Sequence, residues 1–195
     1  MIITNGKIIT WGSANRIEPE GLAILVRNGV IEAIDQQDAL IASHPQEDQI
    51  DAEGQYVMPG NICAHTHFYG AFSRGLAIPG APAENFIQIL QKLWWHLDKA
   101  LDQDGVYFST QVCLIDAIKH GTTTLIDHHA SPNFIDGSLD VIADAINAAG
   151  LRASLCYEVT DRDGAGASKK GLRENVRFID RIKARHPAEI GRAHV

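Results

Sequence analysis

Cysteine is scarce in this sequence, which has only Cys63, Cys113 and Cys156. Their number is odd, they are scattered along the chain, and none belongs to a Cys-x-x-Cys pair. This pattern excludes the disulfide framework that holds many small secreted domains together. We interpret the three residues as free thiols of a protein in the reducing cytoplasm.

Long apolar runs and basic clusters are also missing. No apolar stretch reaches the roughly 18 residues that a membrane span needs, and the first five residues do not open a secretory signal. The chain has 17 lysine and arginine residues against 24 aspartate and glutamate residues, and its net charge of −7 argues against a nucleic-acid footprint. We therefore expect a cytoplasmic protein that binds neither nucleic acid nor membrane.

Short apolar runs separated by turn residues fill the segment 1–58. Asn5-Gly6 and Asn28-Gly29 are strong hairpin signals, because both residue types tolerate a positive φ. Glu53-Gly54 predicts a further turn, and a short helix is expected over 38–43. This many short strands favour a small β-sandwich. The expected strand pairs are 2–3 with 7–10, 22–26 with 30–34, and 49–51 with 56–58.

From Pro59 onward the pattern changes to strands that alternate with helices. The segment 122–126 is β-branched and apolar, which is the composition of a buried strand. Apolar residues recur at helical spacing between the strands. This alternation predicts an α/β fold with a parallel barrel or a doubly wound sheet. We expect strands over 62–64, 122–126 and 151–159, a loop over 68–84, and helices over 85–101, 104–119, 138–149 and 170–185.

One stretch carries the chemistry, and it leads from Pro59-Gly60 through the apolar residues 62–64 to the pair His65-x-His67. Residues two apart in a strand point to the same face, so His65 and His67 project together. Two imidazoles about 6 to 7 Å apart along the backbone can converge on one divalent metal ion. This segment is the candidate metal site.

The spacing Pro-Gly-x-x-x-x-His-x-His resembles the motif that closes the first strand of the (β/α)8 barrel in the amidohydrolase superfamily. The run from Cys63 to Gly80, with Leu93-Trp94-Trp95 and the segment 121–129, resembles aminohydrolases of the SsnA type. These enzymes belong with the cytosine, guanine and S-adenosylhomocysteine deaminases and the triazine hydrolases. The resemblance extends from Ile2 to about Pro187.

The resemblance implies that residues 1–58 form the N-terminal half of a composite β-sandwich. It implies that residues 59–188 form the first strands and helices of a metal-dependent, TIM-like barrel. Three barrel strands are visible where a closed barrel has eight, so we expect a truncated, N-terminal part of a longer enzyme. Residues 189–195 lack a strand pattern and correspond to a common sequencing-adapter read-through, so our hypothesis is that this tail is non-native.

His65 and His67 are the metal ligands that the resemblance implies, for a divalent ion that is Zn²⁺ or, alternatively, Fe²⁺. The other ligands of the family, and its glutamate acid/base, follow strands five, six and eight of the barrel. We therefore expect no catalytic acid/base within this chain. The expected partner is a small-molecule substrate, and the parent protein is expected to form a homo-oligomer.

Two aromatic or basic positions near the histidine pair are candidate substrate contacts. Arg74 lies in the loop that covers the substrate in the related enzymes, and its alternative role is a structural ion pair. Trp94 and Trp95 could form an aromatic wall for a planar heterocycle. Adjacent helical residues diverge by about 100°, so at most one of the two lines the pocket, and we select Trp95.

Three further candidates follow the second and third barrel strands, on the face where barrel active sites lie. His128 and His129 point to opposite sides, so they cannot face the pocket equally. Asp127 beside them is either a cap of the loop or a carboxylate that orients a ligand. Glu158 follows the third strand and could contact ring nitrogens or amino groups of a substrate.

The function that fits best is hydrolysis of a non-peptide C–N bond, with deamination of a purine-like nitrogen heterocycle by a metal-activated water. One alternative is the hydrolysis of cyclic amides, as in dihydropyrimidinases and hydantoinases. The other is a metal-binding fragment without catalysis, because the chain as given lacks the later ligands and the acid/base.

Overall fold

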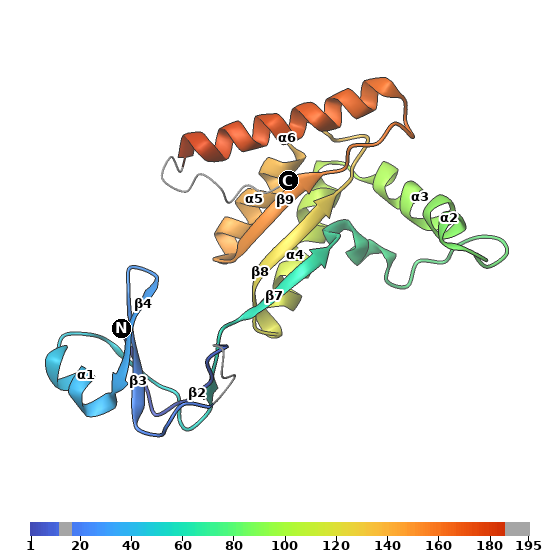
Figure 1. The fold of residues 1–195 in the computed structure, drawn as a ribbon. Helices are drawn as coiled ribbons and strands as arrows, with labels where there is room; N and C mark the ends of the chain where they lie inside the picture. Colours follow the sequence, from blue (N-terminus) through green and yellow to red (C-terminus); the bar gives the residue numbers. More distant parts are fainter. Residues whose placement is uncertain (12–16, 186–195) are drawn as a thin grey trace. The chain divides into compact units, whose positions relative to one another are not determined.

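The computed structural model describes residues 1–11 and 17–185 of the chain (Figure 1). The chain divides into two compact units, Met1–Pro59 and Gly60–Val195. The tail 189–195 that our hypothesis treats as non-native lies outside the described residues. Within the described ranges, no helix is both long enough and apolar enough to cross a membrane.

Two small sheets and one helix build the N-terminal unit. The larger sheet has the strand order β4-β3-β1-β5, in which β1 runs antiparallel to β3 and parallel to β5, while β2 and β6 form a separate parallel pair. Ile2, Ala23, Leu25 and Leu40 form the core. The elements are β1 (Ile2–Thr4), β2 (Lys7–Ile8), β3 (Leu22–Arg27), β4 (Val30–Gln36), α1 (Gln37–Ser43), β5 (Gln49–Asp51) and β6 (Tyr56–Val57).

One of the three predicted strand pairs is confirmed and two are wrong. β3 and β4 form the predicted hairpin, with positive φ at Asn28 and Gly29. β1 and β2 do not pair with each other, nor do β5 and β6. Asn5 and Glu53 do have the expected positive φ, but the two turns run side by side, and the amide of Gly54 donates to the carbonyl oxygen of Asn5 at 2.7 Å. Each turn therefore carries its chain from one sheet into the other.

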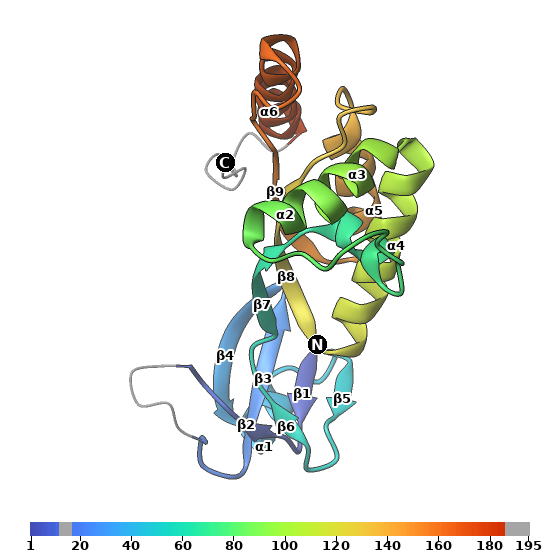
Figure 2. The same cartoon turned by 90° about the vertical axis from the view of Figure 1, so that its right-hand side faces the viewer.

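Three parallel strands in the order β7-β8-β9 form the centre of the second unit. Figures 1 and 2 show α4 and α5 on one face of this sheet. The predicted alternation of strands and helices is confirmed. The regular elements are β7 (Asn61–Thr66), α4 (Gln103–Lys119), β8 (Thr122–His129), α5 (Ser138–Ala149), β9 (Arg152–Tyr157) and α6 (Ala165–Arg185).

Leu125 of β8 and Leu155 of β9 are buried on the helix side of the sheet, together with Leu114 of α4 and Ile142 of α5. The backbone just before β7 packs closely against β8, because a Cβ atom at Gly60 would lie 2.2 Å from Cγ2 of Thr123. Glycine after Pro59 is thus required by the close approach of two strands.

The segment between β7 and α4 differs from the prediction. The predicted loop over 68–84 begins with a 3-10 helix, η1 (Phe68–Ser73). The helix expected over 85–101 is present as a continuous helical segment over 86–100, but its type changes along its length and it includes a π-helical turn. A π turn inserts an extra residue and changes which side chains face the core, and such turns are frequent at functional sites. The parts of this segment are α2 (Phe86–Ile89), η2 (Leu90–Trp94), α3 (Trp95–Leu97) and η3 (Asp98–Ala100).

Candidate metal centre

A β-bulge at the end of β7 aims the two candidate ligands. Cys63 pairs with Leu125 and Thr66 with Asp127, so Ala64 and His65 together oppose a single residue of β8. Bulges of this kind re-aim side chains next to active sites. His65 and His67 meet, and their Nε2 atoms lie 2.9 Å apart with the rings at 79° to each other.

Hydrogen bonding fixes which nitrogen of His67 can bind a metal. Nδ1 of His67 lies 2.8 Å from the backbone carbonyl oxygen of His128. A carbonyl oxygen only accepts, so Nδ1 carries the proton and Nε2 keeps its lone pair. This is the usual way in which proteins orient a metal-binding histidine.

The Nε2 pair fits two neighbouring ligands of one ion. Zinc–nitrogen bonds near 2.0–2.1 Å with tetrahedral angles separate two ligand nitrogens by about 3.3 Å. The observed 2.9 Å is a few tenths of an ångström shorter, a difference that small ring rotations remove. Among residues 1–11 and 17–185, no group of three or more potential ligands comes together. These two histidines alone do not complete a zinc site, which has at least three protein ligands.

Asp127 binds both residues that flank His67. Its Oδ1 atom accepts the amide of Phe68 at 2.8 Å and the hydroxyl of Thr66 at 3.0 Å. Asp127 is buried, and desolvation raises the pKa of its carboxyl group to about 7. The sequence left two roles open for Asp127, a cap of the loop or a carboxylate that orients a ligand. These hydrogen bonds make it a cap, and the turn that it caps carries His67.

His128 and His129 do point to opposite sides. His128 is exposed, and its ring lies 5.5 Å from the ring of His67. Desolvation, and then the nearby His67, lowers the pKa of His128. His129 faces the core and is 1% exposed, which lowers its pKa to about 3. Only His128 therefore shares the face of the histidine pair.

His129 belongs to a buried polar group under the site. Its Nε2 lies 2.9 Å from Oγ of Ser131, whose hydroxyl donates to the carbonyl oxygen of Phe134. The hydroxyl proton is thus used, so Nε2 of His129 donates and carries the proton. The ring packs edge-on against Tyr69 and Tyr157. His129 supports the end of β8 from below.

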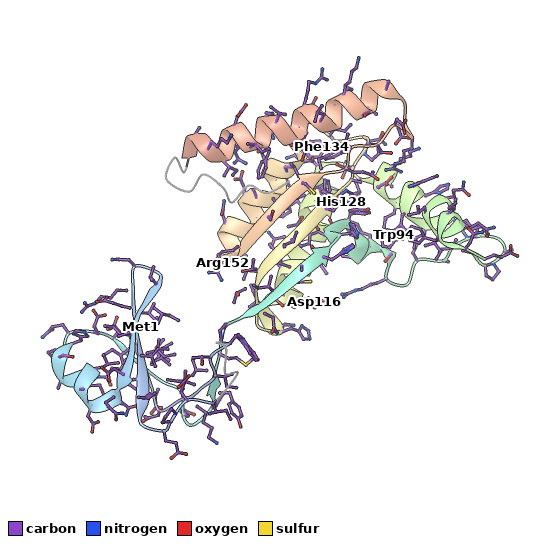
Figure 3. All side chains as sticks on the ribbon, viewed as in Figure 1. Met1, Trp94, Asp116, His128, Phe134 and Arg152 are labelled. Carbon is purple, nitrogen blue, oxygen red and sulfur yellow. The ribbon has the colours of Figure 1, made fainter. Side chains whose placement is uncertain are left out.

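Trp94, not the selected Trp95, stands next to the candidate metal ligands. The ring of Trp94 lies 6.5 Å from that of His67 and 5.9 Å from that of Tyr69. Trp95 instead lies under the guanidinium group of Arg162, at 5.5 Å. Figure 3 shows Trp94 and His128 near the carboxyl end of the sheet, with Arg152 toward its other end.

The other two predicted contacts are held in ion pairs. Arg74 binds Asp116 of α4 at 2.8 Å, and both side chains are exposed. Asp116 lies away from His128 and Trp94 in Figure 3. Glu158 binds Arg162 at 2.9 Å. The structure thus brings together His65, His67 and His128, and it leaves Arg74 apart from them.

Three residues of the site region were missed in the sequence. Tyr69 lies between the rings of Trp94 and His129, and it continues the two-residue spacing of His65 and His67. Asp98 is buried and pairs with Arg162. Asp98 lies four residues after Trp94, on the apolar side of a helical segment, and a carboxylate at such a position could have been recognised in the sequence as buried.

Comparisons with known proteins identify the family of the chain. Residues 56–191 match the model of the amidohydrolase family. A 5-methylthioadenosine/S-adenosylhomocysteine deaminase of Archaeoglobus fulgidus is 31% identical over 135 residues, which are 69% of this chain and 30% of that protein. The enzyme of the same name from Syntrophobacter fumaroxidans is 30% identical over 188 residues, 94% of this chain and 40% of its own length.

Solved structures share the fold at lower identity. A triazine hydrolase from Arthrobacter aurescens superposes with a TM-score of 0.71 at 19% identity, over 92% of this chain and 42% of that enzyme. The guanine deaminase of E. coli has a TM-score of 0.69 at 16% identity, over 92% of this chain and 43% of its own. The chain thus spans 30 to 43% of the length of these relatives. Because the family model matches most of the chain, from residue 56 to residue 191, the chain belongs to the amidohydrolase family.

Proposed function

We propose that the full-length protein is a metal-dependent aminohydrolase that removes an amino group from a nitrogen heterocycle of the purine type. One observation carries the proposal: the Nε2 atoms of His65 and His67 face each other at 2.9 Å, and a backbone carbonyl holds the tautomer that metal binding requires. A divalent ion bound there would lower the pKa of a water molecule and polarise the bond under attack. Zinc is the ion that we propose.

The names of the relatives support the substrate class. They include a 5-methylthioadenosine/S-adenosylhomocysteine deaminase, guanine deaminases, a triazine hydrolase, and an adenosine deaminase from Xanthomonas campestris with bound zinc. The compounds in these names contain planar rings rich in nitrogen. Trp94 is only partly buried and offers aromatic surface beside His67, which suits the face of such a ring.

The residues of this chain divide into two tasks under this proposal. His65 and His67 hold the metal, and the carbonyl of His128 with the carboxylate of Asp127 holds His67. Of the predicted substrate contacts, His128 has the exposed ring next to His67, so we assign it the substrate side of the site. Arg74 and Glu158 are engaged in ion pairs, and the assignment does not rest on them.

The 195-residue chain by itself is proposed to bind metal weakly and to lack turnover. Deamination needs a group that moves protons between the water and the leaving amine. In the part of the chain that the structure describes, no third potential ligand joins the histidine pair. The catalytic acid/base and the further ligands are proposed to lie in the remainder of the full-length protein.

The test is ammonia release by the full-length, zinc-loaded protein from guanine, adenosine, 5-methylthioadenosine and an aminotriazine. Dihydrouracil and hydantoin are assayed in parallel for ring opening, which would identify a cyclic amidohydrolase instead. We expect chelator-sensitive ammonia release that His65→Ala and His67→Ala abolish. His120→Asn is the control, because His120 is exposed and its ring bonds only the carbonyl oxygen of Asp116 in the described contacts. Stoichiometric zinc without turnover of either class would leave the non-catalytic alternative.

A further inference from the structure

Two connections at the carboxyl end of the sheet meet at one arginine, Arg162. Arg162 lies in the loop after β9, and its Nη2 atom binds Oδ2 of Asp98 at 2.6 Å and Oε2 of Glu158 at 2.9 Å. Asp98 belongs to η3, the last part of the helical segment 86–100 that follows β7. The guanidinium group also stands over the ring of Trp95 at 5.5 Å. Arg162 thus joins the connection after β7 to the connection after β9.

Neighbouring contacts tie the same place to the third connection. Nζ of Lys99 binds Oδ1 of Asp163 at 2.6 Å. The carbonyl oxygen of Lys99 accepts a hydrogen bond from the amide group of Asn133, which lies in the loop after β8. The end of the helical segment is therefore held from both adjacent loops.

Burial offsets much of the stability that the ion pair between Asp98 and Arg162 could supply. Asp98 is 2% exposed and the Arg162 side chain 11%. Among the described residues, Oδ1 of Asp98 and both Nε and Nη1 of Arg162 are buried without a hydrogen-bond partner. Buried ion pairs with unpaired polar atoms are frequently less stable than apolar replacements of similar size. What this pair supplies is a defined geometry, because a planar guanidinium both pairs and stacks in one orientation.

The two tryptophans diverge next to this ion pair. The π turn of η2 ends at Trp94, and α3 begins at Trp95. Trp95 is fixed against Arg162, while Trp94 is directed toward Tyr69 and His67. We propose that Arg162 is a positioning residue that holds the segment 86–100, so that Trp94 stands beside the His65–His67 pair. Its effect on catalysis rests on the function proposed above, whereas its effect on the segment does not.

The experiment compares Arg162→Gln, Arg162→Lys and Arg152→Gln in the full-length, zinc-loaded protein. Arg152 is the matched control, because it is an exposed arginine at the opposite end of β9 whose side chain, in the described contacts, bonds threonine hydroxyls at 3.3 and 3.4 Å. The three readouts are amide hydrogen exchange of peptides covering 86–100, zinc content, and kcat and KM for the heterocycle turned over fastest. Lysine keeps the charge for Asp98 but cannot stack and pair at once.

We expect Arg162→Gln to raise exchange over 86–100 at least about tenfold by local opening and to leave zinc content unchanged. It should lower kcat/KM by about 10- to 100-fold, with KM carrying most of the loss, since Trp94 is displaced from the substrate side. In both hydrogen exchange over 86–100 and kcat/KM, Arg162→Lys should fall between Arg162→Gln and the parent protein. Arg152→Gln should match the parent protein in both quantities. If Arg162→Gln does not fold, the intermediate values of Arg162→Lys decide the matter.

Unchanged exchange over 86–100 in a folded Arg162 variant would overturn the proposal. So would raised exchange with an unaltered KM, because Arg162 would then act on the fold without positioning Trp94. If the parent protein turns over none of the heterocycles, the proposed function fails. The exchange data then still decide whether Arg162 holds the segment.

Discussion

His67 donates its Nδ1 proton to the backbone carbonyl oxygen of His128, 2.8 Å away on the neighbouring strand. This bond crosses from β7 to β8 and turns the Nε2 lone pair of His67 toward His65. The acceptor is a main-chain atom, so it is present whatever the side chain at 128. Metal binding and the identity of residue 128 can therefore be separated by mutation.

His67→Asn is expected to abolish tight zinc binding. The asparagine amide can still donate to the carbonyl of His128 as Nδ1 does, but nothing replaces Nε2. Losing an outer partner of a metal ligand costs about 10- to 100-fold in affinity, so losing a ligand should cost at least about 100-fold. Zinc titration against a chromophoric chelator measures this in the full-length protein, with His120→Asn as control. An unaltered dissociation constant would remove His67 from the ligand set.

His128→Gln is expected to leave zinc affinity intact and to raise KM. The carbonyl that orients His67 remains, while the exposed ring beside it is lost. A hydrogen bond from this position is worth about 0.5–3 kcal/mol, which corresponds to a roughly 2- to 150-fold loss in kcat/KM. Kinetics and zinc content of the same preparation decide the matter. Loss of the metal would make His128 a ligand and contradict the site described here.

Asp127→Asn and Asp127→Val separate hydrogen bonding from charge at the turn that carries His67. Asparagine can still accept the amide of Phe68, whereas valine leaves that buried donor unpaired. We expect Asp127→Val to lose about 1–3 kcal/mol of unfolding free energy and to weaken zinc binding about 10- to 100-fold. Asp127→Asn should change zinc affinity far less. Urea denaturation and zinc titration are the measurements, and equal zinc affinities in the two variants would disprove the role.

Local signals predicted most of the elements correctly. The helix over 138–149 has the predicted bounds, because Gly150 ends it in the left-handed conformation that glycine favours. The histidine pair followed from the two-residue period of a strand, although the bulge that completes its geometry depends on β8. Such features lie within a few residues of one another, where periodicity and turn chemistry act.

Contacts between distant residues could not be predicted in this way. Asn5 has the positive φ expected of a turn, but β1 pairs with β5, some 47 residues further on by the register of Ile2 with Gln49. The choice between Trp94 and Trp95 depends on the π turn before them, since one extra residue rotates a helix by about 100°. Arg162 meets Asp98 across 64 residues, and no local pattern announces that pairing.

Glu174→Ala is expected to destabilise the second unit through the start of α5. The N-cap residue of α5 is Gly137, which has no side chain to cap with. The buried Glu174 of α6 accepts the amides of Gly137 and Leu139 at 3.0 and 3.2 Å instead. Leaving these donors unpaired should cost about 1–3 kcal/mol of unfolding free energy.

Denaturant titrations measure that cost, with Asp144→Ala as the matched control. Asp144 also joins α5 to α6, through Arg181, but it is 60% exposed. An exposed pair of this kind is worth at most about 1 kcal/mol. Equal losses in the two variants would show that Glu174 does not serve as the cap.

The final prediction concerns pH and the buried His129. Burial lowers its pKa from 6.5 to about 3 in the folded protein, so the folded state cannot take up a proton that the unfolded state accepts below pH 6.5. The contribution of the neutral His129 to the free energy of unfolding is therefore fully present above pH 6.5, and it is lost as the pH falls toward 3. The free energy of unfolding should decrease by about 1.4 kcal/mol per pH unit in this window from this residue.

His129→Gln isolates the pH-dependent contribution of His129 to stability, because glutamine keeps an N–H donor for Ser131 and does not titrate. We expect the stability difference between the parent protein and this variant to shrink as the pH is lowered from 6.5 to 4.5. Asp127, whose pKa is raised to about 7, acts in the opposite sense, losing its contribution as the pH rises from 3.8 through 7. It is present in both proteins and cancels from the difference. Urea titrations at half-unit pH steps measure the slope, and a difference that stays constant between pH 6.5 and 4.5 would show that folded His129 takes up protons as freely as the unfolded chain.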